Sequence, residues 1–184
     1  MAFRTLRRSP ARWLGLLASA AVVLVALGST TALAASPRVG FGFNARDVSG
    51  FPTGSVSLTG GGAFDLNTAT GHAGGGFSCT QDVGQLFLAG CLQGEGVRWD
   101  AETLLPNTMF KCTGAVAEAA KTATTGEDTV VVQADFYRAG DANDESFTAQ
   151  MIVSTHDLAG DIQGVQNVWV QGVGCGAATV HFGA

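Results

Sequence analysis

Histidine and carboxylate side chains are the first candidates for chemistry in this chain of 184 residues. The histidines are His72, His156 and His181, and Asp157 directly follows the second of them. Neighbouring residues of a strand point to opposite faces, so His156 and Asp157 act together only if they lie in a loop. No Gly-x-Ser-x-Gly nucleophile motif accompanies them. An enzyme site therefore requires His72, His156 or Asp135 to line one cavity, and the sequence assigns no catalytic residue.

Oxygen-bearing side chains alternate in the segment that joins two clear strand patterns near residue 140. Asp141, Asn143 and Glu145 follow the opening of an EF-hand loop, in which alternating oxygens surround Ca²⁺. The glycine and the final glutamate of that loop are missing, and calcium takes about six to eight oxygen ligands. Two hypotheses remain open: a calcium-stabilised module with these three ligands, and a plain hairpin loop in a protein without a cofactor.

Trp169 and Gln171 are the candidate ligand-binding residues. The segment around them is apolar on one face and rich in amides on the other, with Gln166 and Asn167 nearby. An aromatic face beside planar amides suits a polyol, which predicts a shelf for a sugar. The alternative is an isolated surface tryptophan without a function, which is common.

Four cysteines follow the N-terminal segment: Cys79, Cys91, Cys112 and Cys175. An even number in an exported chain predicts two disulfides, for which three connectivities exist. The pattern Phe-x-Cys-Thr surrounds both Cys79 and Cys112, which favours a bridge between two similar strands and leaves Cys91 with Cys175. The cysteines lack the short spacing of zinc sites.

The first 34 residues have the three parts of a secretion signal. Arginines 4, 7, 8 and 12 precede an apolar run over residues 13–27, and Ala32-Leu33-Ala34 follows as a small-x-small site. We expect cleavage after Ala34 or one residue later, which leaves residues 35–184 as a single secreted domain. The alternative is an uncleaved membrane anchor, although a spanning helix needs about 20 apolar residues.

Alternation of apolar and polar residues with a period of two predicts an all-β fold. The clearest strands cover residues 39–44, 55–59, 130–137, 147–154, 168–171 and 179–182. Shorter candidates cover 71–80, 85–91, 96–99 and 108–116, and residues 99–105 are a candidate for one or two helical turns. Two Gly-Gly-Gly runs, at 60–62 and 74–76, predict two similar hairpins. Strand glycines favour an antiparallel barrel of about eight or more strands over the alternative, a β-sandwich.

The charge of the mature chain excludes some partners. All fifteen acidic residues but only six of the ten basic ones follow residue 34, which gives a net charge of −9. Such a surface repels phosphate backbones and anionic lipids, so we expect neither nucleic-acid binding nor membrane binding after the signal is removed.

The run from Gln133 to Phe147, with 164–169 and Gly172-Val-Gly-Cys175 after it, resembles small exported proteins of high-GC bacteria that carry no assigned function. The resemblance covers most of the mature chain and implies no catalytic or binding residue. The leading hypothesis is a non-catalytic extracellular β domain that binds a ligand, a cell-envelope component or a protein. The alternatives are a secreted hydrolase or isomerase with its site inside a barrel, and the calcium-stabilised module.

Overall fold

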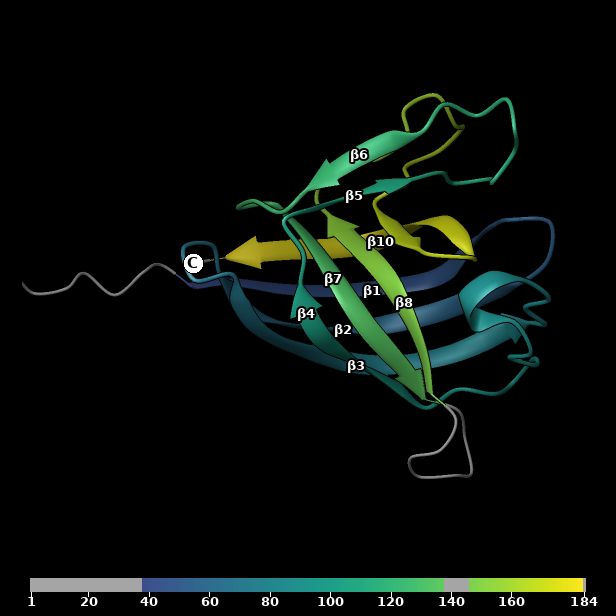
Figure 1. Cartoon of the computed structure of the whole chain (residues 1–184), viewed down its shortest axis with the longest axis horizontal. Helices are drawn as coiled ribbons and strands as arrows, with labels where there is room; N and C mark the ends of the chain where they lie inside the picture. Colours follow the sequence, from purple (N-terminus) through teal and green to yellow (C-terminus); the bar gives the residue numbers. More distant parts are fainter. Residues whose placement is uncertain (1–37, 138–145, 184) are drawn as a thin grey trace, which may run out of the picture. The chain divides into compact units, whose positions relative to one another are not determined.

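The computed structural model describes residues 38–137 and 146–183, and Ser36–Ala184 form one compact unit. Eight strands of this part close into a barrel in the order β1-β10-β9-β8-β7-β4-β3-β2, and every neighbouring pair is antiparallel (Figure 1). The predicted barrel is therefore confirmed over the sandwich. The barrel strands are β1 (Arg38–Gly50), β2 (Ser55–Asp65), β3 (Thr70–Gln81), β4 (Arg98–Leu104), β7 (Thr129–Tyr137), β8 (Ser146–Ser154), β9 (Val168–Val170) and β10 (Gly174–Gly183).

The period-two pattern sends one face of each strand into the barrel. On β1, Val39, Phe41 and Phe43 are buried, while the glycines between them face out and are partly exposed. The ring of Phe41 lies 5.7 Å from that of Phe182 and 6.1 Å from that of Phe64, measured between centroids. Large apolar side chains therefore fill the barrel, and this core holds it together.

The glycine runs make room for the largest of these side chains, Trp99 on β4. Gly60 pairs with Gly75 across the β2–β3 ladder, and Gly75 pairs with Trp99. A Cβ at Gly60 would lie 2.7 Å from the indole ring, whose Nε1–H donates to the Thr59 carbonyl at 3.2 Å. The two runs thus belong to one hairpin and pair with each other, so the prediction of two similar hairpins was wrong.

The segment 82–97 closes one end of the barrel. Its only regular element among the described residues is a 3-10 turn, η1 (Leu86–Leu88), which Figure 1 shows near the β9–β10 turn. Leu88 is buried as a plug, whereas Leu86 and Phe87 are exposed. The Cys79–Cys91 disulfide and the bond from Val83 N–H to the Cys91 carbonyl (2.8 Å) hold this loop. The predicted strand over 85–91 was therefore wrong.

A small two-stranded sheet lies outside the barrel and covers part of its wall (Figure 1). It consists of β5 (Asn107–Phe110) and β6 (Lys121–Thr124). With the segment 155–167 it encloses a second apolar cluster against the outward faces of β7 to β10. We call β5, β6 and the loop between them the cap. The Cys112–Cys175 disulfide joins the cap to β10.

The disulfides therefore pair Cys79 with Cys91 and Cys112 with Cys175. The pairing that the repeated Phe-x-Cys-Thr pattern favoured was wrong, because β3 and β5 are not neighbours. The helical turns expected over 99–105 were also wrong. That segment is β4, whose Trp99 and Ala101 face the barrel core. No helix within residues 38–137 and 146–183 has the length and apolarity to span a bilayer.

Candidate functional site

Side chains of the described residues fill the barrel interior. Its largest fully buried side chains include Trp99, Phe64 and Phe136. The void between Phe41, Phe64 and its neighbours measures only about 10 Å³, which is the space of about one water molecule. Among the described residues, none of the polar residues that are buried as a whole is ionisable; they are Ser55, Thr108, Thr129, Ser154 and Asn167. The larger hollows that the described residues form lie on the outside of the barrel.

The residues that an interior enzyme site requires lie apart. His72 on β3 and His181 on β10 are exposed, and Asp135 on β7 accepts a hydrogen bond from Thr148 Oγ1–H at 2.7 Å. His156 follows β8, and its Nε2 lies 2.6 Å from Asp128 Oδ2. This contact holds the pKa of Asp128 below its usual value. No contact within the described residues joins these histidines to one another or to Asp135.

Asp157 does not act with His156. Its Oδ1 instead accepts hydrogen bonds from the backbone N–H groups of Ala159 (3.1 Å) and Gln166 (3.0 Å). The carboxylate therefore holds the loop that packs beside the cap.

The predicted shelf for a sugar at Trp169 is wrong. Trp169 is only 3% exposed, because the cap covers the outward face of β9. The indole packs against Phe110 with 5.6 Å between ring centroids, and its Nε1–H donates to the Lys111 carbonyl at 2.9 Å. Gln171 Oε1 accepts from the Gln150 N–H at 3.0 Å. Both residues of the predicted shelf thus make internal contacts.

The predicted calcium ligands Asp141, Asn143 and Glu145 lie outside the described residues, so the calcium hypothesis stays a prediction. Among residues 38–137 and 146–183, no group of three or more His, Cys, Asp or Glu side chains is placed to hold a metal ion.

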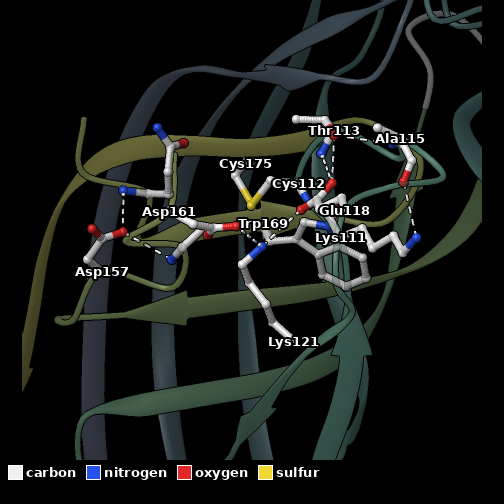
Figure 2. Close-up of a disulfide and its surroundings, with 12 residues drawn as sticks. Lys111, Cys112, Thr113, Ala115, Glu118, Lys121, Asp157, Asp161, Trp169 and Cys175 are labelled. Atoms are coloured by element: carbon white, nitrogen blue, oxygen red, sulfur yellow. Dashed lines mark hydrogen bonds and ion pairs between the residues drawn. A yellow bond between two sulfur atoms is a disulfide. The ribbon is translucent and has the colours of Figure 1, made fainter. Parts of the chain in front are cut away.

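A buried carboxylate organises the cap next to its disulfide (Figure 2). Glu118 accepts hydrogen bonds from the backbone N–H groups of Cys112 (2.7 Å) and Thr113 (2.8 Å) and from Thr113 Oγ1–H (2.6 Å). Burial alone would raise its pKa, but these hydrogen bonds and Lys121 outweigh burial and lower the pKa to about 2. The side chain is therefore a structural anion that keeps Cys112 in place to join Cys175.

Lys121 connects the cap to the segment 155–167. Its Nζ lies 3.1 Å from Glu118 Oε1 and 3.1 Å from Asp161 Oδ2 (Figure 2). Burial lowers the pKa of Lys121, but the hydrogen bonds to both carboxylates outweigh it and raise the pKa overall. All these groups satisfy one another, so the cap has a structural role.

The strand register brings a row of outward residues together on a part of the wall outside the cap. Asn44 pairs with Thr179 of β10 and with Thr59 of β2, and Thr59 pairs with Gly76 of β3. Paired residues of neighbouring strands share a face. The row therefore crosses β10, β1, β2 and β3 with small and polar side chains.

A β-bulge places Arg46 beside this row. The β1 register shifts between Ala45 and Asp47 against β10, and between Ala45 and Val48 against β2. The extra residue breaks the alternation, so that Arg46 and Asp47 are both exposed while Ala45 and Val48 are buried. Bulges commonly re-aim a side chain in this way. No carboxylate of the described residues lies within ion-pair distance of Arg46.

Two hollows meet at Asn44 and Arg46. One, of about 570 Å³, lies over β1 and β10 and is lined by Ala177, Ala178 and Thr179. The other, of about 430 Å³, lies over β1, β2 and β3, and its outward side chains include Ser57, Thr59, Ser78 and Val97. We call the two hollows together the outer-wall groove. It combines hydroxyl and amide groups with one cation.

A crevice of about 270 Å³ continues from the groove along the edge of the cap. It shares Ala177 with the first hollow and is lined by Asp47, Thr113 and Gln166 as well. The bulge thus directs its cation toward the groove and its anion toward the crevice.

The sequence patterns did not single out Arg46 as a site residue. The signal that marks it is the interruption Ala45-Arg46-Asp47-Val48, where two charged residues replace the expected alternation. The hydroxyl and amide residues of the groove carry no such signal, because only the strand register brings them together.

Comparison with known proteins adds no relative to this description: no protein-family model, curated protein or solved structure matches the chain.

Proposed function

We propose that this chain is a secreted protein whose mature part, residues 35–184, works as a non-catalytic β-barrel that binds a ligand or a cell-envelope partner through its outer-wall groove. Residues 1–34 serve as the signal peptide. The two disulfides are consistent with an extracellular protein, since such bonds persist in oxidising compartments.

The observation that carries this proposal is the contrast between the inside and the outside of the barrel. The interior is filled with apolar side chains, whereas concave polar surface lies on the wall around Asn44 and Arg46. Binding sites are typically concave, with a few polar groups that orient the ligand. The groove has this composition, and its rigid strands hold the polar groups in fixed positions.

The test is saturable retention of labelled mature protein on washed cell envelopes of the organism that makes it. Thr59 is exposed and lines the second hollow, so Thr59→Trp obstructs that hollow. We expect this variant to lose at least nine-tenths of the retention.

Thr122→Trp is the matched control, because Thr122 is exposed on β6, outside the groove. Circular dichroism verifies that both variants keep the fold. Equal retention of both variants and the wild type, or retention that never saturates, would contradict a binding role for the groove.

A further inference from the structure

We propose that the outer-wall groove recognises an acidic saccharide, and that Arg46 binds its carboxylate. This inference rests on the proposed binding function and names the class of ligand. It starts from the one cation in the groove, whose guanidinium faces no carboxylate of the described residues. A guanidinium offers two parallel N–H groups, which match the two oxygens of a carboxylate.

The surroundings of Arg46 suit a ligand rich in hydroxyl groups. Asn44 offers an amide, and Thr59, Ser78 and Thr179 offer hydroxyls from three different strands. These groups can donate and accept hydrogen bonds, as the hydroxyls of a sugar also do. The Thr59 hydroxyl already donates to the Phe43 carbonyl at 3.3 Å, so it offers its oxygen as an acceptor. No exposed aromatic ring lines the described groove, so the ligand is held by its polar edges and binds with modest affinity.

The shape of the groove fits several sugar units. The hollows lie on both sides of Asn44 and Arg46, so a ligand anchored at the arginine continues in two directions. From β10 to β3 the groove crosses three spacings between strands, about 14 Å in all. A chain of sugars that crosses the strands therefore meets hydroxyl groups along its length and a cation near its middle.

The net charge of the mature chain narrows the class of ligand further. The net charge is −9, and Arg46 is the one cation that the described residues place in the groove, so a dense polyanion would meet long-range repulsion. Asp47, which follows Arg46, lines the crevice and not the groove. Its negative charge repels an anionic group of the ligand from the crevice, so such a group binds in the groove at Arg46. The arrangement thus fits carboxylates that are spaced by neutral sugars.

A peptide partner fits this wall less well. The closed barrel leaves no strand edge free beside Arg46, so a peptide cannot add as a further strand. Its backbone would depend on side-chain hydrogen bonds alone. The outward side chains of the groove are mainly small and polar, and they form no deep apolar pocket for an anchoring residue.

The experiment titrates oxidised mature protein with a hyaluronan tetrasaccharide, in which glucuronate alternates with a neutral acetamido sugar. The fully N-acetylated chitotetraose has the same length and no charge, and a blocked tetrapeptide with one glutamate represents the peptide class. We expect Arg46→Gln to weaken tetrasaccharide binding at least tenfold, which is about 1.4 kcal/mol. It should also remove the preference over chitotetraose. Arg46→Lys should recover only part of the affinity, because lysine restores the charge without the two parallel N–H groups of a guanidinium.

Arg38→Gln is the matched control, since it removes the same charge from an exposed position of the same strand outside the groove. It should stay within twofold of the wild type. Equal binding by wild type and Arg46→Gln, no binding of the tetrasaccharide, or tighter binding of the peptide would each overturn the saccharide assignment. The envelope retention of Thr59→Trp is measured in parallel. If that variant still loses retention, only the ligand class is wrong; if it does not, the groove has no binding role.

Discussion

Glu118→Gln tests how the cap is held on the barrel. The substitution keeps the size of the side chain and one carbonyl-type acceptor but removes the anion. In the wild type that anion accepts three hydrogen bonds from Cys112 and Thr113 and contacts Lys121. We expect a marked loss of stability, because the surrounding donors remain buried around a neutral group.

The size of the expected loss of stability follows from the pKa of Glu118. Folding lowers this pKa from its ordinary value of 4.5 to about 2, which corresponds to about 3 kcal/mol of stabilisation at neutral pH. The folded pKa lies below the unfolded one, so the contribution is complete above about pH 5. It is lost as the pH falls from there to about 2. The difference between wild type and Glu118→Gln should shrink over the same range.

The assay is urea unfolding at several pH values, followed by circular dichroism for the barrel and by fluorescence of a Trp99→Phe background, in which Trp169 beneath the cap is the remaining tryptophan of the mature chain. Glu127→Gln is the control, because Glu127 is exposed and has no resolved hydrogen bond within the described residues. It should change stability by less than about 0.5 kcal/mol. The reasoning fails if the two variants unfold alike at pH 7, or if the effect of Glu118→Gln does not depend on pH.

Three further predictions concern the barrel and its loops. Gly75→Ala should destabilise the protein by about 3 kcal/mol or more, because the new Cβ would overlap the Thr59 carbonyl. The neighbouring Gly76→Ala places its methyl group 3.2 Å from Thr59 Cγ2 and should destabilise far less. Thermal unfolding compares the two variants. Replacing Cys112 and Cys175 by alanine should lower the free energy of unfolding by about 4 kcal/mol on the chain-entropy model. Replacing Cys79 and Cys91, which are 12 residues apart, should lower it by about 3 kcal/mol. Equal or reversed losses in urea unfolding would contradict this model. Asp128→Asn should lower stability above about pH 4, where the lowered pKa of Asp128 contributes. The loss should be less than about 1 kcal/mol, because the pair of Asp128 and His156 is exposed. A loss that persists at pH 2 would refute this cause.

Local patterning predicted most of the barrel strands because their two faces meet different environments. The alternation in β1, β7, β8 and β10 is visible in the sequence, since the apolar face fills the barrel. The glycines inside the strands pointed correctly to a closed barrel. Segments with one-sided burial are therefore the predictable part of this fold.

The errors lie where distant contacts decide the local structure. Asp100 and Pro106 suit the start and the end of a helix over 99–105. The segment instead pairs as β4, with Trp99 packed against Gly60 and Gly75. The apolar run 85–91 looks like a strand, yet it folds back to plug the barrel, with Leu86 at a positive φ of 57°. The burial of Trp169 depends on a cap that is about 60 residues away in sequence.

The candidate site was the least predictable part. Its polar residues come from β1, β2, β3 and β10 and meet through strand register, which a single sequence does not reveal. The bulge at Arg46 was visible only as a defect in the pattern. The feature that looked most like a site in the sequence, Trp169 with Gln171, turned out to belong to the packing beneath the cap.

Peptide mapping of the protein recovered from the medium of its own cells tests the account most directly. We predict a chain that begins at Ala35 or Ser36, with proteolytic fragments joined as Cys79–Cys91 and Cys112–Cys175. A full-length chain retained in the cytosol with four free thiols, or fragments joined as Cys79–Cys112, would contradict it.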